Sequence, residues 1–110
     1  MKKAGYGSIV ITSSMASVNK SANMSGYAAS KASVNHMVAN LAHDFGPEVR
    51  INAVGPGATR TAALESVLTP EIEEKMLSHT PIKRLGTAED IAGAMLYFAS
   101  PVSVWVSGQT

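Results

Sequence analysis

The sequence predicts an α/β fold built on a parallel β-sheet. Short runs rich in β-branched residues, typical of buried strands, alternate with longer segments whose apolar residues recur at helical spacing. The order is strand, long helix, strand, helix, which is typical of parallel strands joined by right-handed crossover helices. With 110 residues, the chain is long enough for one domain and too short for two.

The first strand is predicted over residues 8–13, where "GSIVITSS" places β-branched residues behind a glycine. A long helix is predicted over residues 25–45, and the Gly-Pro pair at 46–47 sets its end. We expect one stripe of this helix to face the sheet, and polar residues such as Asn35 to lie on the opposite face. The residues of that stripe are Tyr27, Lys31, Val34, Val38, Leu41 and Phe45.

The second strand is predicted over residues 49–55, and it ends in the sequence Gly-Pro-Gly. Residues 62–80 carry apolar side chains at helical spacing, and a Thr-Pro pair suits a helix start within them. A last helix is predicted over residues 88–100, with Thr87 and Asp90 as a capping box. We expect no clear strand after this helix. Each of the two strands should therefore keep at least one unpaired edge, which is unusual for a parallel sheet.

Composition and charge exclude several classes of function. The formal net charge is +1 and the basic residues are scattered, so no basic patch suits a nucleic acid. The chain has no cysteine, and its three histidines are not grouped with carboxylates, so we expect neither disulfides nor a metal site. No apolar run approaches the ~20 residues of a membrane span, and the basic start lacks the apolar core of a signal peptide. We therefore expect a cytoplasmic protein without nucleic-acid or membrane partners.

Three residues with side chains suited to proton transfer are predicted to meet at one edge of the sheet. Tyr27 and Lys31 are neighbours on their helix, because the Cβ atoms of residues four apart lie about 5–6 Å from one another. Ser14 follows the first strand, and the start of the next helix belongs to the same edge of the sheet. Ligands of open α/β sheets bind at that edge. The alternative is that Tyr27 only packs at the start of the helix.

These motifs resemble those of the short-chain dehydrogenase/reductase family over essentially the whole chain. The matching residues are Ser14 in "ITSS", Tyr27 and Lys31 in "YAASK", and Asn52, Pro56 and Gly57 in "VRINAVGPGATRT". The resemblance implies part of a Rossmann-like doubly wound parallel sheet. The segments "NMSGYAASKA", "TPEIEEKMLSHTPIKRLG" and "WVSGQ" look most like a group within the family, the bacterial 7α-hydroxysteroid dehydrogenases. Acyl-carrier-protein reductases and sugar dehydrogenases share much of these segments and stay open as alternatives.

The resemblance implies an oxidoreductase that uses NAD or NADP to move a hydride to or from a secondary alcohol or ketone. Tyr27 would give a proton to the carbonyl oxygen in reduction, and Ser14 would hydrogen-bond the same oxygen. Lys31 would hold the ribose hydroxyls of the cofactor, and a nearby ammonium favours a phenolate over a phenol. The residues that the resemblance places at the cofactor are Tyr27, Lys31, Pro56, Gly57, Thr59 and Thr61.

Residues 62–80 correspond in the family to a mobile substrate lid. Its predicted lining residues are Leu64, Leu68, Ile72 and Met76, and such an apolar lining suits a steroid or another bulky apolar substrate. The alternative is an amphipathic helix that covers the sheet. Family members are usually homodimers or homotetramers, and small residues along the helix 25–45 are compatible with a second subunit or with another helix of the same chain.

Some parts of the family pattern have no counterpart in this sequence. The glycine-rich turn that binds the pyrophosphate is absent, and so are the first βαβ units and the last strand. We therefore expect the C-terminal half of a dehydrogenase that binds dinucleotide poorly alone and exposes strand edges prone to aggregation. The alternative is a non-catalytic remnant or oligomerising module with the same ancestry.

Overall fold

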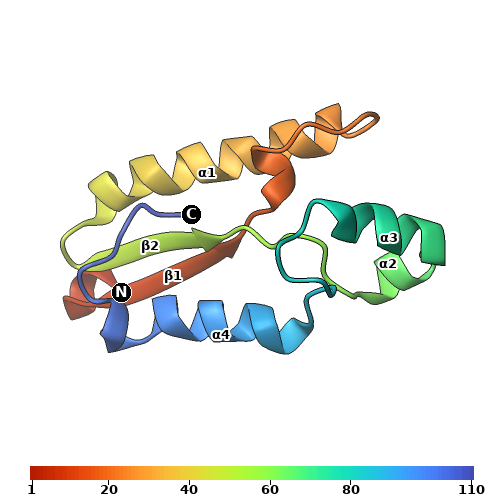
Figure 1. Ribbon diagram of the computed structural model, residues 1–110. Helices are drawn as coiled ribbons and strands as arrows, with labels where there is room; N and C mark the ends of the chain where they lie inside the picture. Colours follow the sequence, from red (N-terminus) through yellow and green to blue (C-terminus); the bar gives the residue numbers. More distant parts are fainter.

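The computed structural model describes all 110 residues and contains two parallel strands with a helix on each side (Figure 1). Strand β1 (Gly7–Thr12) pairs along its whole length with strand β2 (Val49–Val54). Helix α1 (Ser25–Phe45) connects the two strands and covers one side of the sheet, and helix α4 (Ala88–Ala99) covers the other. These bounds lie within one residue of the predicted ones, so the predicted order of elements is confirmed.

Helix α1 packs against β2 through the middle of its predicted stripe. Val38 is fully buried, and Val34 and Leu41 are partly buried beside it. Tyr27 and Phe45, at the two ends of the stripe, remain partly exposed. The buried partners of Val38 on β2 are Val49, Ile51 and Ala53. The core is therefore a thin layer between α1 and β2, and the first turn of α1 extends past it at the carboxyl end of the sheet.

The segment after α4 lies along the outer edge of β2. The 3-10 turn Pro101–Ser103 leads into the C-terminal residues, whose backbone hydrogen-bonds with the strand. The N–H of Gly108 donates to the carbonyl of Ile51 (2.7 Å), and the N–H of Ala53 donates to the carbonyl of Gln109 (2.7 Å). The expectation of an unpaired edge on both strands is wrong for β2, because the C-terminal residues cover its outer edge.

Two polar side chains of β2 hold this segment in place. Asn52 is fully buried; its Nδ2 donates to the carbonyl of Val106 (3.0 Å), and its Oδ1 accepts from the N–H of Gln109 (3.1 Å). The guanidinium of Arg50 donates to the carbonyls of Ser103 (2.9 Å) and Val106 (3.3 Å). Since a buried polar group without a partner is costly, these bonds specify where the C-terminal segment docks.

Two further helices stand beyond the carboxyl ends of the strands. Helix α2 spans Ala62–Glu65 and helix α3 spans Pro70–Ser78, and Figure 1 shows both beside the end of the sheet. A single amphipathic helix covering the sheet, the alternative for this segment, is therefore wrong. The two ends of the excursion meet in a parallel bridge, where the N–H of Gly86 donates to Ala58 and the N–H of Arg60 donates to Gly86.

Helices α3 and α4 begin at capping residues. The Thr69 hydroxyl accepts from the N–H of Ile72 (3.3 Å) at the start of α3. The Thr87 hydroxyl accepts from the N–H of Asp90 (3.3 Å), and the Asp90 carboxylate accepts from the N–H of Thr87 (2.8 Å). The predicted capping box is confirmed. No helix of the structure combines the length and the apolar character needed to cross a membrane.

Candidate active site

Lys31 lies against the carboxyl end of β1. Its Nζ donates a hydrogen bond to the carbonyl oxygen of Thr12, the last residue of the strand (3.0 Å). The same Nζ lies 5.8 Å from the centroid of the Tyr27 ring, a distance at which an ammonium is attracted to the ring. Tyr27 is 46% exposed, and its hydroxyl makes no hydrogen bond within the chain. The phenol is therefore next to the ammonium and available to a ligand.

Ser14 begins the turn that follows β1. Its Oγ accepts a hydrogen bond from the N–H of Ala16 (3.1 Å) and so caps the short 3-10 helix Met15–Ser17. This bond uses an acceptor site of the hydroxyl and leaves its proton free to be donated. The Ser14 side chain is thus oriented by its own turn.

A network that the sequence did not predict joins this turn to α1. The Oγ of Ser13, a residue only 2% exposed, donates to Oδ1 of Asn35 (2.5 Å), and the carbonyl of Lys31 lies 3.3 Å from the same Oγ. The Nδ2 of Asn35 donates to the hydroxyl of Ser17 (2.8 Å), which in turn donates to the carbonyl of Ser14 (2.6 Å).

The prediction that Asn35 faces away from the sheet is therefore wrong. Asn35 follows Lys31 by four residues, and residues at this spacing lie on the same face of a helix. The spacing from Lys31 therefore indicates the true position of Asn35. The polar character of its side chain alone indicates a position facing solvent.

The loop after β2 passes directly beside Ser14. The N–H of Met15 donates to the carbonyl of Pro56 (2.9 Å). A Cβ added to Gly55 would lie 3.5 Å from the carbonyl carbon of Ser14, so the two backbones are in close contact here. The structure thus brings Ser14 and Pro56 together at the edge of the sheet that also holds Lys31.

Thr59 and Thr61 carry the loop onward to α2. The Thr59 hydroxyl donates to the carbonyl of Gly57 (3.1 Å), and the Thr59 backbone N–H has no partner within the chain. The Thr61 hydroxyl accepts from the N–H of Leu64 (3.2 Å), which leaves its proton available. A free amide N–H and a free hydroxyl proton are donors that suit a carboxamide oxygen. The residues present therefore fit the cofactor contacts that the sequence predicts for them.

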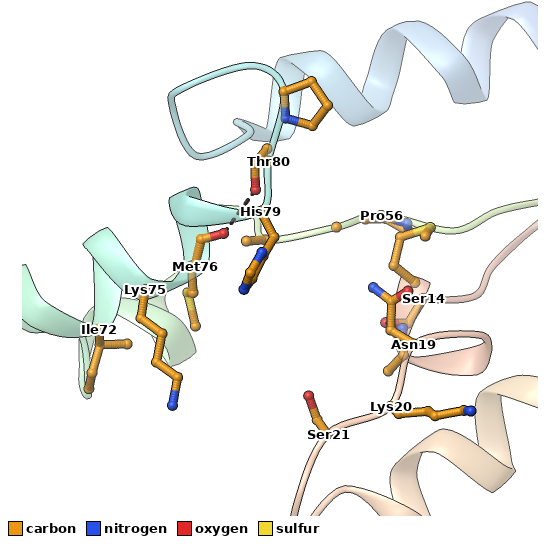
Figure 2. Close-up of a pocket in the computed structure, with 15 residues that line it drawn as sticks. Ser14, Asn19, Lys20, Ser21, Pro56, Ile72, Lys75, Met76, His79 and Thr80 are labelled. Atoms are coloured by element: carbon orange, nitrogen blue, oxygen red, sulfur yellow. Dashed lines mark hydrogen bonds between the residues drawn. The ribbon is translucent and has the colours of Figure 1, made fainter.

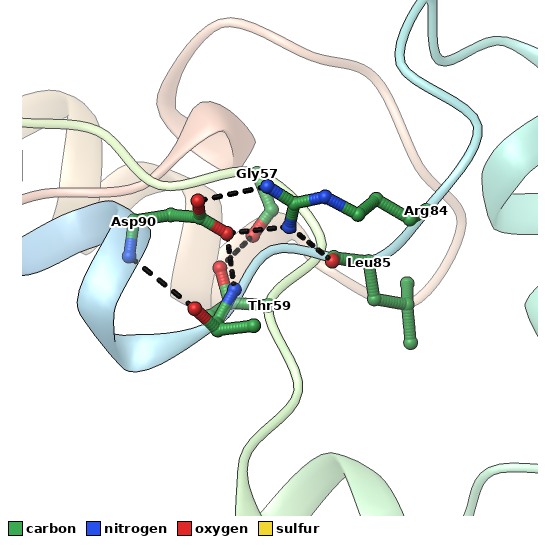
Figure 3. A network of polar contacts seen from close by, with 6 residues as sticks. Gly57, Thr59, Arg84, Leu85 and Asp90 are labelled. Atoms are coloured by element: carbon green, nitrogen blue, oxygen red, sulfur yellow. Dashed lines mark hydrogen bonds and ion pairs between the residues drawn. The ribbon is translucent and has the colours of Figure 1, made fainter.

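An ion pair lies beside this loop (Figure 3). The guanidinium of Arg84 donates to both carboxylate oxygens of Asp90, in one case at 2.8 Å, and to the carbonyl of Leu85 at 3.0 Å. The hydrogen bond from Arg84, together with that from the Thr87 N–H, holds the pKa of Asp90 well below its usual range. Figure 3 shows Thr59 next to this pair. The pair connects Arg84, in the segment after α3, to Asp90 in the first turn of α4.

A cleft of about 1060 Å³ opens between the end of the sheet and α3 (Figure 2). Ser14 and Pro56 line it on the side of the sheet, and Ile72 and Met76 line it on the side of α3. Its lining thus combines a hydroxyl at the predicted catalytic edge with apolar side chains across from it. No group of His, Asp and Glu side chains in the structure could hold a metal ion.

Six of the predicted site residues do not line this cleft, namely Tyr27, Lys31, Thr59, Thr61, Leu64 and Leu68. Leu64 lies on α2, and Leu68 lies in the connection between α2 and α3. The helical segment breaks between them, so only α3 presents a face to the cleft. Tyr27 and Lys31 lie outside the lining too, although Lys31 contacts the strand end two residues before Ser14.

Comparisons with known proteins identify relatives over the whole chain. The family model described as enoyl-(acyl carrier protein) reductase matches residues 1–110. The 7α-hydroxysteroid dehydrogenase of Escherichia coli (strain K12) is 54% identical over 110 residues, which are 99% of this chain and 43% of that protein. The chain therefore spans less than half the length of this relative.

Solved structures give the same result. A 7α-hydroxysteroid dehydrogenase complexed with NADH and 7-oxo glycochenodeoxycholic acid matches with a TM-score of 0.95 and 55% identity, over 99% of this chain and 43% of that one. A short chain dehydrogenase/reductase family protein matches with a TM-score of 0.87 and 35% identity, over 100% of this chain and 45% of that one. The predicted fold class and family are confirmed. This chain belongs to the short-chain dehydrogenase/reductase family.

Proposed function

We propose that this chain carries the proton-transfer residues of an NAD- or NADP-dependent oxidoreductase that acts on a secondary alcohol or ketone. The observation that carries the proposal is the common location of Ser14 and Lys31 at the carboxyl end of β1, with Tyr27 beside the Lys31 ammonium. The name and the 54% identity of the E. coli relative support a dehydrogenase.

The substrate that we propose is a 7α-hydroxysteroid or its 7-oxo counterpart. A relative at 55% identity was solved with 7-oxo glycochenodeoxycholic acid. The cleft of about 1060 Å³ has apolar side chains in its walls, and ligand pockets of about 300–1,000 Å³ commonly take molecules of this kind. An acyl-carrier-protein reductase is the second candidate, since the matching family model carries a description of that kind.

In reduction, Tyr27 donates its hydroxyl proton to the carbonyl oxygen of the substrate. The free hydroxyl proton of Ser14 hydrogen-bonds the same oxygen and stabilises the charge that develops there. The ammonium of Lys31 lies 5.8 Å from the centroid of the Tyr27 ring. Oxidation of the alcohol runs these proton transfers in reverse.

The cofactor would be held by Lys31 and the loop after β2. The nicotinamide supplies or accepts the hydride when it is bound. The free N–H of Thr59 and the hydroxyl proton of Thr61 would donate to its carboxamide, and Lys31 would reach the ribose hydroxyls. We propose that the cofactor is NAD or NADP, and that the protein is cytoplasmic and homo-oligomeric.

The test is a chimera in which this chain replaces the segment of the E. coli 7α-hydroxysteroid dehydrogenase that it matches. We expect the chimera to reduce 7-oxo glycochenodeoxycholic acid, followed by the loss of reduced-nicotinamide absorbance with NADH and with NADPH. Tyr27→Phe should lower kcat by about 10²–10⁴-fold, the usual contribution of a positioned acid or base. The control is Tyr6→Phe, because Tyr6 is 77% exposed near the start of β1 and should not affect the rate.

Each alternative gives a different result in this assay. A non-catalytic remnant or oligomerising module predicts a folded chimera without turnover of any ketone. An acyl-carrier-protein reductase or a sugar dehydrogenase predicts turnover of those substrates and none of the steroid. Full rate in the Tyr27→Phe chimera would show that Tyr27 is not the proton donor.

Cofactor binding to the 110-residue chain alone is measured by calorimetric titration of NADH and NADPH. We expect weak binding. Micromolar binding with turnover would contradict the expectation that the chain alone binds dinucleotide poorly.

A further inference from the structure

A backbone bridge joins the loop after β2 to the segment that leads into α4. The N–H of Gly86 donates to the carbonyl of Ala58 (2.9 Å), and the N–H of Arg60 donates to the carbonyl of Gly86 (2.8 Å). Both bonds are made by the residues on either side of Thr59. Successive residues of an extended chain direct their N–H and C=O groups to opposite sides, so the Thr59 N–H is directed away from Gly86. The bridge therefore fixes the direction of this free donor.

Arg84 and Asp90 hold the chain on both sides of Gly86 (Figure 3). The Arg84 guanidinium donates to the carbonyl of Leu85 (3.0 Å), the residue before Gly86. The Asp90 carboxylate accepts from the N–H of Thr87 (2.8 Å), the residue after it. The guanidinium and the carboxylate bind each other through two hydrogen bonds, one of them 2.8 Å long. The ion pair and its two backbone contacts therefore enclose Gly86.

Gly86 and Thr59 are in close contact. A Cβ added to Gly86 would lie 3.4 Å from Oγ1 of Thr59 and 3.9 Å from Oδ2 of Asp90. The preceding residue, Leu85, is only 4% exposed and holds the segment against the rest of the chain. Since both neighbours of Thr59 are hydrogen-bonded to Gly86, a shift of Gly86 would shift Thr59 as well.

The ion pair is better suited to fixing the position of a loop than to stabilising the fold. The side chains of Arg84 and Asp90 are 56% and 39% exposed, and exposed pairs contribute little to stability. The guanidinium, however, donates to both oxygens of the carboxylate. Such a two-point contact restricts the relative orientation of the two groups in addition to the energy that it adds.

We propose that Arg84 and Asp90 are positioning residues for the cofactor, and that they set the direction of the Thr59 N–H through Gly86. The proposal rests on the proposed function, in which this N–H donates to the nicotinamide carboxamide. Without the ion pair, Gly86 and the bridge move more freely, and the Thr59 N–H is less often directed at the carboxamide. The loss therefore weakens the binding of the carboxamide and leaves the proton donor, Tyr27, in place.

The experiment compares NADH and NADPH with their thionicotinamide analogues, in which sulfur, a weak acceptor, replaces the carboxamide oxygen. Binding to the chimera described above is measured by calorimetric titration, so the result does not depend on turnover. One hydrogen bond usually changes an affinity by about threefold to tenfold, and we expect the unsubstituted chimera to prefer the oxygen form by this factor. Arg84→Ala should reduce the preference to less than about twofold.

Further variants test whether the two residues act as a pair. Arg84→Lys keeps the charge but lacks the planar fork that binds both carboxylate oxygens, so its preference should be intermediate. Asp90→Asn should act as Arg84→Ala does, and the double variant should reduce the preference no further. The matched control is Lys83→Ala, which removes the neighbouring cation. The Lys83 ammonium donates to the carbonyls of Leu77 and Ser78 at the end of α3, and its loss should leave the preference unchanged.

Amide hydrogen exchange of the cofactor-free chimera tests the role of the bridge. The amides of Gly86 and Arg60 should exchange faster in Arg84→Ala, because the bridge opens more often. Their exchange in Lys83→Ala should equal that of the unsubstituted chimera. Far-ultraviolet circular dichroism checks that each variant is folded, and Arg84→Lys carries the comparison if Arg84→Ala is not.

The outcomes separate this inference from the proposed function. An unchanged preference for the oxygen form in Arg84→Ala, or unchanged exchange at Gly86 and Arg60, would overturn the inference and leave the oxidoreductase assignment intact. Equal binding of both forms by the unsubstituted chimera would overturn the inference as well. A chimera that binds a cofactor but reduces no ketone would overturn the proposed function, and the binding comparison would still decide the inference. A chimera that binds neither cofactor would overturn both.

Discussion

The buried hydroxyl of Ser13 donates a hydrogen bond to Oδ1 of Asn35 across the junction between β1 and α1. Ser13 immediately precedes Ser14, and Asn35 follows Lys31 by one helical turn. The bond therefore links the backbone that carries one proposed catalytic residue to the helix that carries another. Catalytic side chains keep their geometry only if the neighbouring residues that support them are fixed by packing and hydrogen bonds.

We predict that Asn35→Ala, in the chimera, lowers kcat by about tenfold and leaves KM within about twofold, because small displacements of catalytic groups are costly. The measurement is steady-state reduction of the 7-oxo steroid. The control is Asn40→Ala on the same helix, because the Asn40 amide is exposed and donates only to the carbonyl of His36. A change in KM alone, or equal losses in both variants, would contradict a positioning role for Asn35.

We predict that Asn52→Ala loosens the C-terminal segment. The substitution removes the partner of the Gln109 N–H and one of the two donors to the carbonyl of Val106, the other being Arg50. A backbone group left unpaired away from water costs about 1–3 kcal/mol. Amide hydrogen exchange should show faster exchange at Gly108 and Ala53, whose bonds join this segment to β2. Unchanged protection at both amides would mean that the backbone bonds alone hold the segment.

We predict that Val38→Ala lowers the free energy of unfolding of the chain by about 2 kcal/mol, because it leaves a cavity in the layer between α1 and β2. Urea titration followed by far-ultraviolet circular dichroism measures the change. The matched control is Val67→Ala; Val67 is 62% exposed, so the effect should stay within about 0.5 kcal/mol. Equal effects of the two substitutions would mean that this layer is not the core.

We predict that the stability contributed by Asp90 depends on pH. The hydrogen bond from Arg84 lowers the pKa of Asp90 in the folded chain below the ordinary value of about 3.9. The contribution is therefore fully present well above pH ~4 and is lost as the pH falls further, because the carboxylate must then be protonated. The melting temperature of Asp90→Asn should lie below that of the unsubstituted chain at pH 7, and the gap should narrow below pH ~4.

The control for this pH series is Asp44→Asn, since the Asp44 carboxylate takes part in none of the ion pairs. Its melting temperature should follow that of the unsubstituted chain at every pH. A gap for Asp90→Asn that persists unchanged to pH ~2 would mean that the side-chain shape, and not its charge, holds the cap at Thr87.

The order and bounds of the main elements could be predicted from the sequence because their signals are local. Helix α1 begins and ends at the predicted Ser25 and Phe45, where a Gly-Pro pair stops it. The capping box of Thr87 and Asp90 also needs only residues three apart. The neighbouring Tyr27 and Lys31 follow from helical periodicity, so this part of the candidate site was predictable as well.

The remaining features depend on partners that lie far apart in the sequence. Asn52 meets Val106 and Gln109 at separations of 54 and 57 residues, and no periodic pattern records such a contact. The sequence also did not predict the break between α2 and α3. Because of this break, Ile72 and Met76 on α3 line the cleft, whereas Leu64 and Leu68 do not.

By itself, the sequence determined the α/β class, the family and the helix on which Tyr27 and Lys31 are adjacent, since periodicity, caps and motifs are written into neighbouring residues. Only the tertiary structure decided that Asn35 points at the strand end, that the C-terminal residues cover β2, and that a cleft opens between the end of the sheet and α3. Those outcomes come from the docking of distant segments, where buried polar groups find the partners that local chain geometry cannot supply.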